Sequence, residues 1–161
     1  MTSTALMNTY GDRAATLVKG RGAWLWDEKG NKYLDALSGI AVCGLGHSHP
    51  AITKVVVEQS NTLTHCSNFF TIPNQELLAE KLCHISGMDK VFFGNSGAEA
   101  NEAAIKMARL FGHQQGIALP TVLVMENAFH GRTLATLSAS GGRRVQALSL
   151  IHISEPTRLG F

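Results

Sequence analysis

The run 94–99, Gly-Asn-Ser-Gly-Ala-Glu, has the clearest potential for chemistry, because its small and polar residues open a helical pattern. In the first turn of a helix several backbone N–H groups have no partner, and the helix dipole adds partial positive charge. Small residues let an anion approach this backbone, so the turn suits a phosphate group. The run matches neither the Walker A pattern nor G-x-G-x-x-G, which disfavours a nucleotide. Taken alone, such a run is more often a plain helix start, capped by Ser96 and without a ligand.

The elements around this turn predict a βαβ unit. Apolar runs at 90–93 and 121–125 are expected to be buried strands, and the pattern between them predicts a helix over 97–111. A strand, a helix and a strand within about 35 residues imply neighbouring parallel strands. On the helix, Glu102 and Lys106 are spaced for an i,i+4 ion pair, and the helix is expected to end near Gly112.

The N-terminal half predicts smaller elements. Residues 1–22 are expected to be irregular, and a hairpin is expected where 23–26 and 32–34 flank a glycine-containing turn. The glycine-rich segment 38–48 is expected to be a loop. Helices are predicted from His49-Pro50 onward and over 74–86, the first because proline suits a first turn.

Composition narrows the class of protein. With 161 residues, 45% of them apolar and 16% charged, the chain suits one ordinary α/β domain. The net charge of +2 is scattered, which predicts no binding to nucleic acid or membrane. There is neither a long apolar segment nor a signal-like N-terminus. Three cysteines without CxxC spacing fit reduced thiols, so a cytoplasmic location is expected.

Three motifs carry a resemblance to a known family. The segment 95–106, Asn-Ser-Gly-Ala-Glu-Ala-Asn-Glu-Ala-Ala-Ile-Lys, resembles the cofactor-phosphate segment of the class III pyridoxal-phosphate-dependent aminotransferases. The segment 128–133, Ala-Phe-His-Gly-Arg-Thr, is similar to the motif that follows it in that family. The segments 37–42 and 45–50 resemble the family's N-terminal active-site loop. In order and at family spacing, these motifs extend the resemblance over residues 7–147.

The resemblance implies a fold and a domain organisation. The fold expected is the N-terminal part of the α/β fold type I transferase. Residues 1–60 would form an N-terminal segment with part of the small domain and the active-site loop, and 61–147 would begin the cofactor-binding large domain with its mainly parallel sheet. The departing run 148–161 resembles the in-frame translation of a sequencing adapter, and we expect it to be an artefact.

The resemblance also implies an activity and its site. The cofactor would be pyridoxal 5'-phosphate, with Gly97 and Ala98 as backbone donors to its phosphate and Ser96 beside them. Phe129 would stack on the pyridine ring, and Arg132 would hold the substrate carboxylate with its planar donor fork. The reaction expected moves the terminal amino group of N-acetylornithine to 2-oxoglutarate in arginine biosynthesis, within a homodimer. Succinylornithine, ornithine and 4-aminobutyrate are alternative donors.

The lysine that holds the cofactor covalently in this family has no counterpart in the sequence, so no catalytic residue is assigned and the chain alone is expected to be inactive. Lys106 lies nine residues beyond Gly97, about 13 Å along a helix, and matches no family lysine motif. A non-catalytic phosphate-binding fragment is therefore a second hypothesis. A third is a zinc module, with candidate ligands at Cys43, His47, His49, His65 and Cys66, although their spacing fits no known finger.

Overall fold

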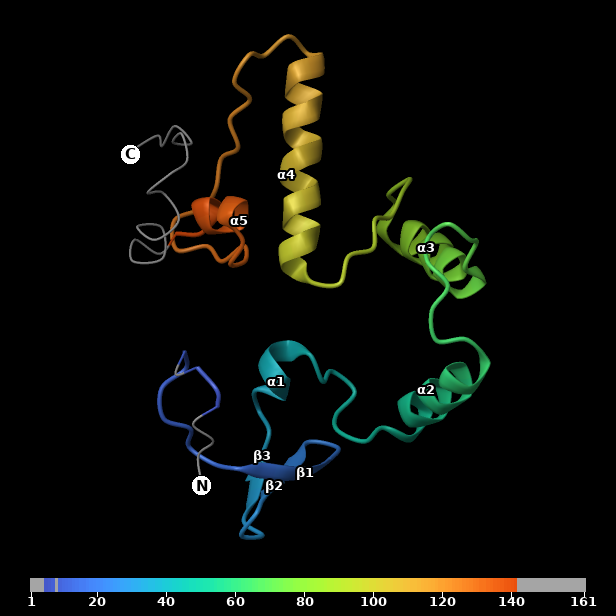
Figure 1. Cartoon of the computed structure of the whole chain (residues 1–161), viewed down its shortest axis with the longest axis vertical. Helices are drawn as coiled ribbons and strands as arrows, with labels where there is room; N and C mark the ends of the chain where they lie inside the picture. Colours follow the sequence, from blue (N-terminus) through green and yellow to red (C-terminus); the bar gives the residue numbers. More distant parts are fainter. Residues whose placement is uncertain (1–4, 8, 142–161) are drawn as a thin grey trace. The chain divides into compact units, whose positions relative to one another are not determined.

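The computed structural model describes residues 5–7 and 9–141, which divide between Ile72 and Pro73 into two units (Figure 1). Each unit is described by itself. The adapter-like run 148–161 lies outside the described residues, so its expected origin stays a prediction. The proposed domain organisation, with a larger domain beginning near residue 61, likewise stays a prediction.

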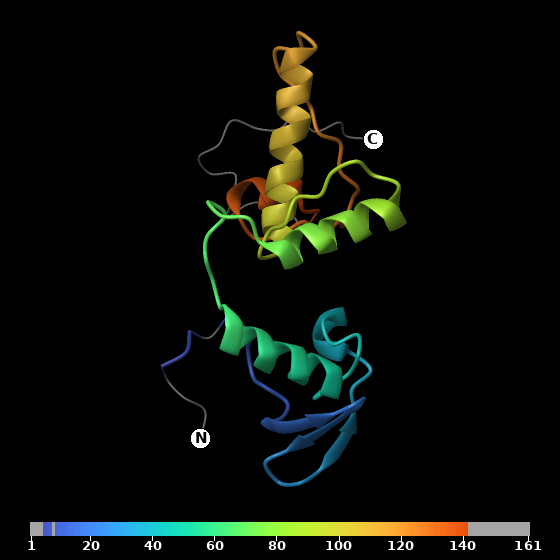
Figure 2. The ribbon, with the colours of Figure 1, turned by 90° about the vertical axis from the view of Figure 1, so that its right-hand side faces the viewer.

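The N-terminal unit contains a three-stranded antiparallel sheet, in the order β1-β2-β3, formed by Leu17–Arg21, Trp24–Asp27 and Lys32–Leu34 (Figure 2). The predicted hairpin is confirmed, because β2 and β3 pair through Trp24 and Leu34, Leu25 and Tyr33, and Trp26 and Lys32. The expectation of irregular backbone before residue 23 is wrong for β1. Its five residues include a glycine and two charges, so their pattern is weak, and pairing with β2 fixes their extended conformation.

The hairpin turn is organised by the carboxylate of Asp27. Asp27 accepts hydrogen bonds from the backbone N–H groups of Lys29 and Asn31 at 2.9 and 2.8 Å. The Asn31 side-chain amide and the Tyr33 hydroxyl also donate to it, at 2.9 and 2.7 Å. Gly30 adopts a φ of 82°, the left-handed conformation that glycine allows at little cost. Polar contacts thus define this end of the sheet.

The segment expected to be a loop contains one unusual turn, α1 at Ser38–Ala41. Its four residues have positive φ angles between 51° and 63°, so the turn is left-handed. Such a conformation costs roughly 1–2 kcal/mol for each residue with a side chain. Hydrogen bonds from the Val42 and Cys43 amides to the Ser38 carbonyl, 2.8 and 2.9 Å long, close the turn.

The two helices predicted next are confirmed. Helix α2 spans Pro50–Thr62, with His49 as its N-cap and proline in its first turn. Helix α3 spans Pro73–Ser86 and begins the second unit. On α2, Ile52, Val55 and Val56 are between 51% and 60% exposed, so no described residue covers the predicted apolar face.

Helix α4, Gly97–Gln114, is the main element of the second unit, and a short helix α5, Leu134–Ala139, contacts it (Figure 1). The prediction for α4 holds at its start but not at its end. Gly116, with φ 79°, ends the helix: its amide donates to the His113 carbonyl and that of Ile117 to Gly112. This is a Schellman arrangement. Gly112 instead packs against Pro120, whose Cβ would lie 2.7 Å from an added methyl group.

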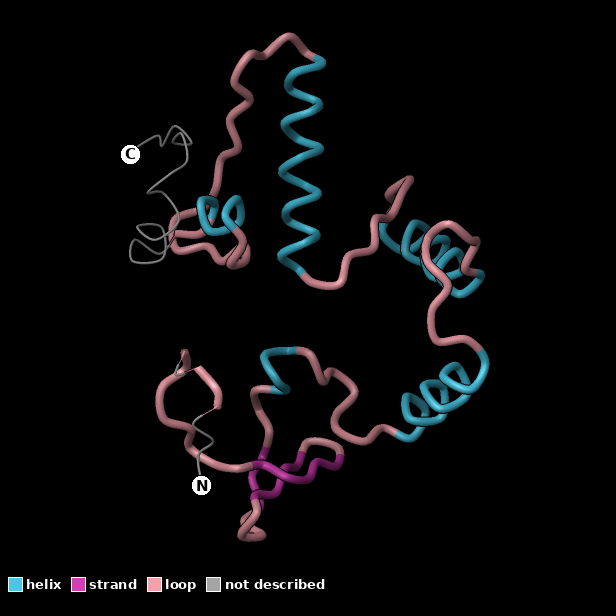
Figure 3. The backbone as a smooth tube through the Cα atoms, in the orientation of Figure 1, coloured by secondary structure: helices cyan, strands magenta, loops and turns pink. Residues whose placement is uncertain are grey.

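The two strands expected around α4 are not formed: residues 90–93 and 121–125 are irregular in Figure 3. The predicted parallel pairing, and with it the βαβ unit, is therefore absent from the described residues. A parallel strand is stabilised by hydrogen bonds to neighbours and by cover on both faces. Neither is present, since Phe92 is 63% exposed and Leu123 75% exposed. The apolar pattern shows where these segments could be buried, but partners are needed to make them strands.

No apolar side chain in the described ranges is buried. The buried residues with polar or charged side chains are Asp27, Thr136 and Ser140, each satisfied by hydrogen bonds. The order in each unit is therefore local, made by helices, a hairpin and side-chain hydrogen bonds. None of the helices in this part of the chain is both long and apolar enough to cross a bilayer.

Candidate active site

The first turn of α4 forms the anion-binding end of the candidate site. Ser96 is the N-cap in extended conformation, and its hydroxyl accepts a hydrogen bond from the Glu99 amide at 3.2 Å. The Glu99 carboxylate turns back to the Asn95 amide, 2.6 Å away. An added methyl group at Gly94 would lie 3.2 Å from the Glu99 Cβ, so Gly94 permits this close packing. These side-chain hydrogen bonds therefore fix the conformation of the turn.

This arrangement suits a phosphate. A methyl group added at Gly97 would have no atom within 4 Å, so the space in front of its backbone is open. Among the residues described, the Gly97 and Ala98 amides donate to no protein acceptor, while those of Glu99 and Ala100 are bound to Ser96. Two free amides at a helix start, next to a hydroxyl, are the donors an anion needs.

The segment 128–133 is held against this turn by its backbone. Gly131 is buried with a φ of 135°, and a methyl group there would lie 2.9 Å from the Ala98 Cβ and 2.6 Å from the Thr136 hydroxyl. Only glycine fits at this contact. The structure thus brings the two segments of the predicted site together, next to the start of α4.

Two neighbouring residues of α4 attach this segment by hydrogen bonds. The Asn101 side-chain amide donates to the His130 carbonyl at 2.7 Å. The Thr133 hydroxyl donates to the Glu102 carboxylate. Among the described residues the expected Glu102–Lys106 ion pair is not formed, and Glu102 accepts from Thr133. Arg132 therefore lies in a short stretch of backbone fixed to α4 on both sides.

A second group of hydrogen bonds joins the segment 128–133 to α5 and to Ser140. Thr133 caps α5, and its amide donates to the Thr136 hydroxyl at 3.0 Å in a capping box. The Ser140 hydroxyl accepts from the His130 amide at 3.1 Å and donates to the Thr136 carbonyl at 2.8 Å. Thr136 is fully buried and Ser140 is 4% exposed. These hydrogen bonds of small polar residues hold 128–141 together as one folded segment beside the start of α4.

The side chains predicted to contact the cofactor and the substrate, those of Phe129 and Arg132, lie at the surface of this segment. Phe129 is 72% exposed, which leaves its ring available for stacking. Arg132 is also exposed. The sequence did not single out Asn101 as a site residue, nor Gly131, Thr133, Thr136 or Ser140. Their signal was faint, because a threonine spaced three residues from another marks a capping box only when a helix follows.

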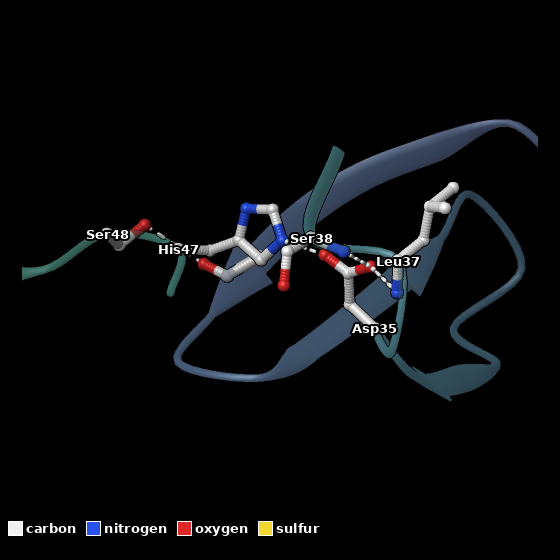
Figure 4. Close-up of polar contacts among 6 residues, drawn as sticks. Asp35, Leu37, Ser38, His47 and Ser48 are labelled. Atoms are coloured by element: carbon white, nitrogen blue, oxygen red, sulfur yellow. Dashed lines mark hydrogen bonds and ion pairs between the residues drawn. The ribbon is translucent and has the colours of Figure 1, made fainter. Parts of the chain in front are cut away.

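A separate cluster lies in the N-terminal unit, where Asp35 joins the loop to the end of the sheet (Figure 4). His47 Nε2 lies 2.6 Å from the Asp35 carboxylate, and the amides of Ser38 and Leu37 donate to its other oxygen at 2.7 and 3.1 Å. The hydrogen bond with His47, followed by those of the two amides, lowers the pKa of Asp35, although burial opposes this shift. Backbone hydrogen bonds join His47 to Gly22, so the motif around His47 is fixed to the sheet.

The zinc hypothesis gains no support from these contacts. No group of three or more potential metal ligands gathers in the part of the chain that the structure describes. His47 is engaged by Asp35, and the three cysteines are half-buried free thiols.

Comparison with known proteins gives the family of the chain. The sequence profile of the family described as "Aminotransferase class-III" matches residues 7–157. The chain belongs to the class-III aminotransferases. Its similar curated relatives include the acetylornithine aminotransferase of Nitrosomonas europaea, 63% identical over 88% of this chain and 36% of the relative. That of Prochlorococcus marinus is 53% identical over 89% of this chain and 34% of the relative.

Solved structures give the same class. The taurine:2-oxoglutarate aminotransferase of Bifidobacterium kashiwanohense, solved with PLP and glutamate, has a TM-score of 0.80 at 29% identity, covering 89% of this chain and 32% of that one. The N-acetylornithine aminotransferase of Stenotrophomonas maltophilia has a TM-score of 0.69 at 42% identity, covering 77% and 35%. The predicted fold class, a part of the fold of PLP-dependent aminotransferases, is confirmed by these structures. The chain spans about a third of the length of the curated relatives it matches.

Proposed function

We propose that the chain supplies the cofactor-phosphate and substrate-carboxylate contacts of an acetylornithine aminotransferase that uses pyridoxal 5'-phosphate. The observation that supports this most directly is the contact between Gly131 and Ala98, because it joins the two motif segments. The 63% identity to an acetylornithine aminotransferase supports the donor substrate, N-acetylornithine, ahead of succinylornithine, ornithine or 4-aminobutyrate. The acceptor is 2-oxoglutarate, and the pathway is arginine biosynthesis in the cytoplasm.

The residues at the start of α4 fit the cofactor's phosphate. The amides of Gly97 and Ala98 donate to phosphate oxygens, and the helix dipole favours the negative charge. The Ser96 hydroxyl, which already accepts from Glu99, keeps its own proton for a phosphate oxygen. The Glu99 carboxylate accepts from the backbone and side-chain amides of Asn95, which offset its negative charge at the turn.

The segment 128–133 orients the rest of the reactants. Phe129 stacks on the cofactor ring and excludes water from that face. Arg132 binds the substrate carboxylate through two parallel hydrogen bonds, which fix the substrate's direction. When bound, pyridoxal phosphate supplies an aldehyde to which the amine attaches and a ring that withdraws electrons as a proton leaves.

Covalent attachment of the cofactor is assigned to no lysine of this chain. Lys106 is on α4, about 13 Å along the axis from Gly97, and Lys90 precedes the turn. The chain alone therefore binds the cofactor without covalent attachment and does not turn over, which is also the behaviour of a phosphate-binding fragment. Homodimer formation with shared active sites is proposed for the whole enzyme.

The test combines binding and reductive trapping on the 161-residue chain. We expect pyridoxal phosphate to bind with micromolar to millimolar affinity, competitively with inorganic phosphate. After borohydride reduction, mass spectrometry should find no single lysine labelled in preference to the others. Binding that is insensitive to phosphate would contradict the assignment to α4, and a specifically labelled lysine would contradict the assignment of attachment. Donor choice requires activity assays on a protein that includes this sequence and the remaining length of its relatives.

A further inference from the structure

We propose that Asn101 and Glu102 are positioning residues that hold Arg132 beside the first turn of α4. The inference rests on the proposed function, because it explains how the carboxylate-binding and phosphate-binding groups keep a fixed separation. Neither residue is assigned a contact with cofactor or substrate. Both act through the backbone and side chains of the residues on either side of the Gly131–Arg132 pair.

The geometry points to a clamp with two hydrogen bonds. Asn101 donates to the His130 carbonyl at 2.7 Å, one residue before Gly131. Glu102 accepts from the Thr133 hydroxyl, one residue after Arg132. Because consecutive residues of one helix hold both ends, the stretch between them cannot shift along α4 without breaking at least one bond. Asn101 and Glu102 are both half-buried, and the bond from Asn101 is itself partly buried, whereas the bond to Glu102 lies at the surface.

The contact at Gly131 adds a third point of attachment to α4, besides the two hydrogen bonds of the clamp. Its backbone rests on Ala98, whose amide is a proposed phosphate donor, so the stretch is held one turn before Asn101 on the same helix. The capping box of Thr133 and Thr136 fixes the following residue as the start of α5. Arg132 therefore leaves the backbone at a place set by α4 on one side and α5 on the other.

Variants that remove or keep one donor or acceptor test each of the two hydrogen bonds. Asn101→Asp keeps the side-chain shape but removes the donor to a carbonyl. Thr133→Val removes the hydroxyl that Glu102 binds, whereas Thr133→Ser and Glu102→Gln keep a donor and an acceptor. Lys106→Ala changes an exposed residue of the same helix to a good helix former and serves as the control.

The first readout requires no ligand. Backbone amide hydrogen exchange across 130–133 should accelerate about tenfold in Asn101→Asp and Thr133→Val, as expected when a hydrogen bond of ordinary strength is lost. Exchange should stay near that of the wild type in Thr133→Ser, Glu102→Gln and Lys106→Ala. Unchanged exchange in Asn101→Asp would overturn the proposal, whether or not the chain binds a cofactor.

The second readout tests whether the clamp acts through Arg132. The probes are pyridoxamine phosphate and its stable conjugate with glutamate, which adds carboxylates. Asn101→Asp should weaken the conjugate about tenfold and pyridoxamine phosphate by less than about threefold. In an Arg132→Gln background the further loss on the conjugate should vanish. Additive losses would overturn the positioning role. If the wild-type chain binds neither probe, the proposed cofactor function fails, and the exchange data still decide the clamp.

Discussion

His47 and Asp35 are twelve residues apart in sequence, yet the ring nitrogen Nε2 and the carboxylate oxygen Oδ2 lie 2.6 Å apart (Figure 4). The same carboxylate receives the amides of Leu37 and Ser38 at the start of the left-handed turn α1. One side chain therefore connects the end of β3, the strained turn and the loop that returns to β1. The hydrogen bonds at Asp35 offset part of the cost of four consecutive residues with positive φ.

His47→Ala should raise the pKa of Asp35 toward its ordinary value of 3.8, because the hydrogen bond with His47 is the main cause of its lowering. The lowered pKa means that this carboxylate stabilises the fold above pH 4 and that its contribution is lost as the pH falls through the folded value. An NMR titration of the Asp35 carboxyl carbon measures the shift. His49→Ala, a change at a neighbouring histidine without a bond to Asp35, is the control. An Asp35 titration unchanged by the loss of His47 would contradict the assignment.

The turn between β2 and β3 should be sensitive to acid between about pH 4 and pH 2. The side-chain hydrogen bond from Asn31, with further bonds from Tyr33 and two amides, lowers the pKa of Asp27 from 3.8 to about 2, against the effect of burial. Protonation then weakens the acceptor for the Lys29 and Asn31 amides, so their protection against exchange, relative to the intrinsic rate at each pH, should fall across this window. Asn31→Ala should raise the Asp27 pKa more than Tyr33→Phe does. The reverse order would show that the hydroxyl, not the amide, is the main donor.

Gly97→Ala should weaken the binding of pyridoxal phosphate without lowering the stability of helix α4. The added methyl group meets no atom within 4 Å, and alanine is the better helix former, so helix stability should be unchanged or rise by up to about 1 kcal/mol. The methyl group enters the space proposed for the phosphate, so affinity for pyridoxal phosphate should fall about tenfold. Circular dichroism and a binding titration on the same samples make the comparison. Undiminished affinity would place the phosphate elsewhere.

Gly131→Ala should loosen the attachment of the segment 128–141 to α4. Its methyl group would overlap the Thr136 hydroxyl and the Ala98 side chain, and its φ of 135° is strained for any residue with a side chain. A cost of about 2–4 kcal/mol is expected from crowding and strain together. Proteolysis near residue 130 should accelerate. Gly116→Ala, which has positive φ but open space, should cost only about 1 kcal/mol. Equal effects at both glycines would show that crowding at Gly131 is unimportant.

The chain alone should be prone to aggregation. Large apolar residues on every long helix and in both failed strands are exposed, and no described apolar side chain is buried. Surfaces of this kind associate when no partner covers them. Size-exclusion chromatography should show oligomers, with binding of a hydrophobic dye and weak near-ultraviolet circular dichroism. A monomer with cooperative thermal unfolding would contradict this prediction.

Sequence patterns predicted most of the local elements. The start of α2 followed from Pro50, the start of α4 from Ser96, and the β2–β3 hairpin from its glycine-containing turn. Each depends on residues within a few positions of one another, where sequence and structure are directly linked. The end of α4 was placed early because Gly112 resembles a helix terminator, whereas it serves packing against Pro120.

The features that could not be predicted from the sequence depend on contacts between residues that are far apart in the chain. The strands expected at 90–93 and 121–125 need neighbours to bond with, and an apolar pattern cannot provide them. Asn101 and Thr133 are ordinary polar residues until the backbone of 130–133 lies against α4. The roles of Ser96, Gly97, Ala98, Phe129 and Arg132 came from family motifs and stay predictions until binding is measured.

Polar networks without a buried apolar interior also determine how the chain responds to heat. The heat-capacity change of unfolding comes mainly from apolar surface newly exposed to water, about 12–15 cal/mol/K for each residue of an ordinary globular protein. Here no apolar side chain of the described residues is buried, and many are largely exposed to water. Calorimetry on a dilute sample should therefore find a heat-capacity change per residue well below that range. Its stability would vary almost linearly with temperature, without the curvature that produces cold denaturation in compact proteins.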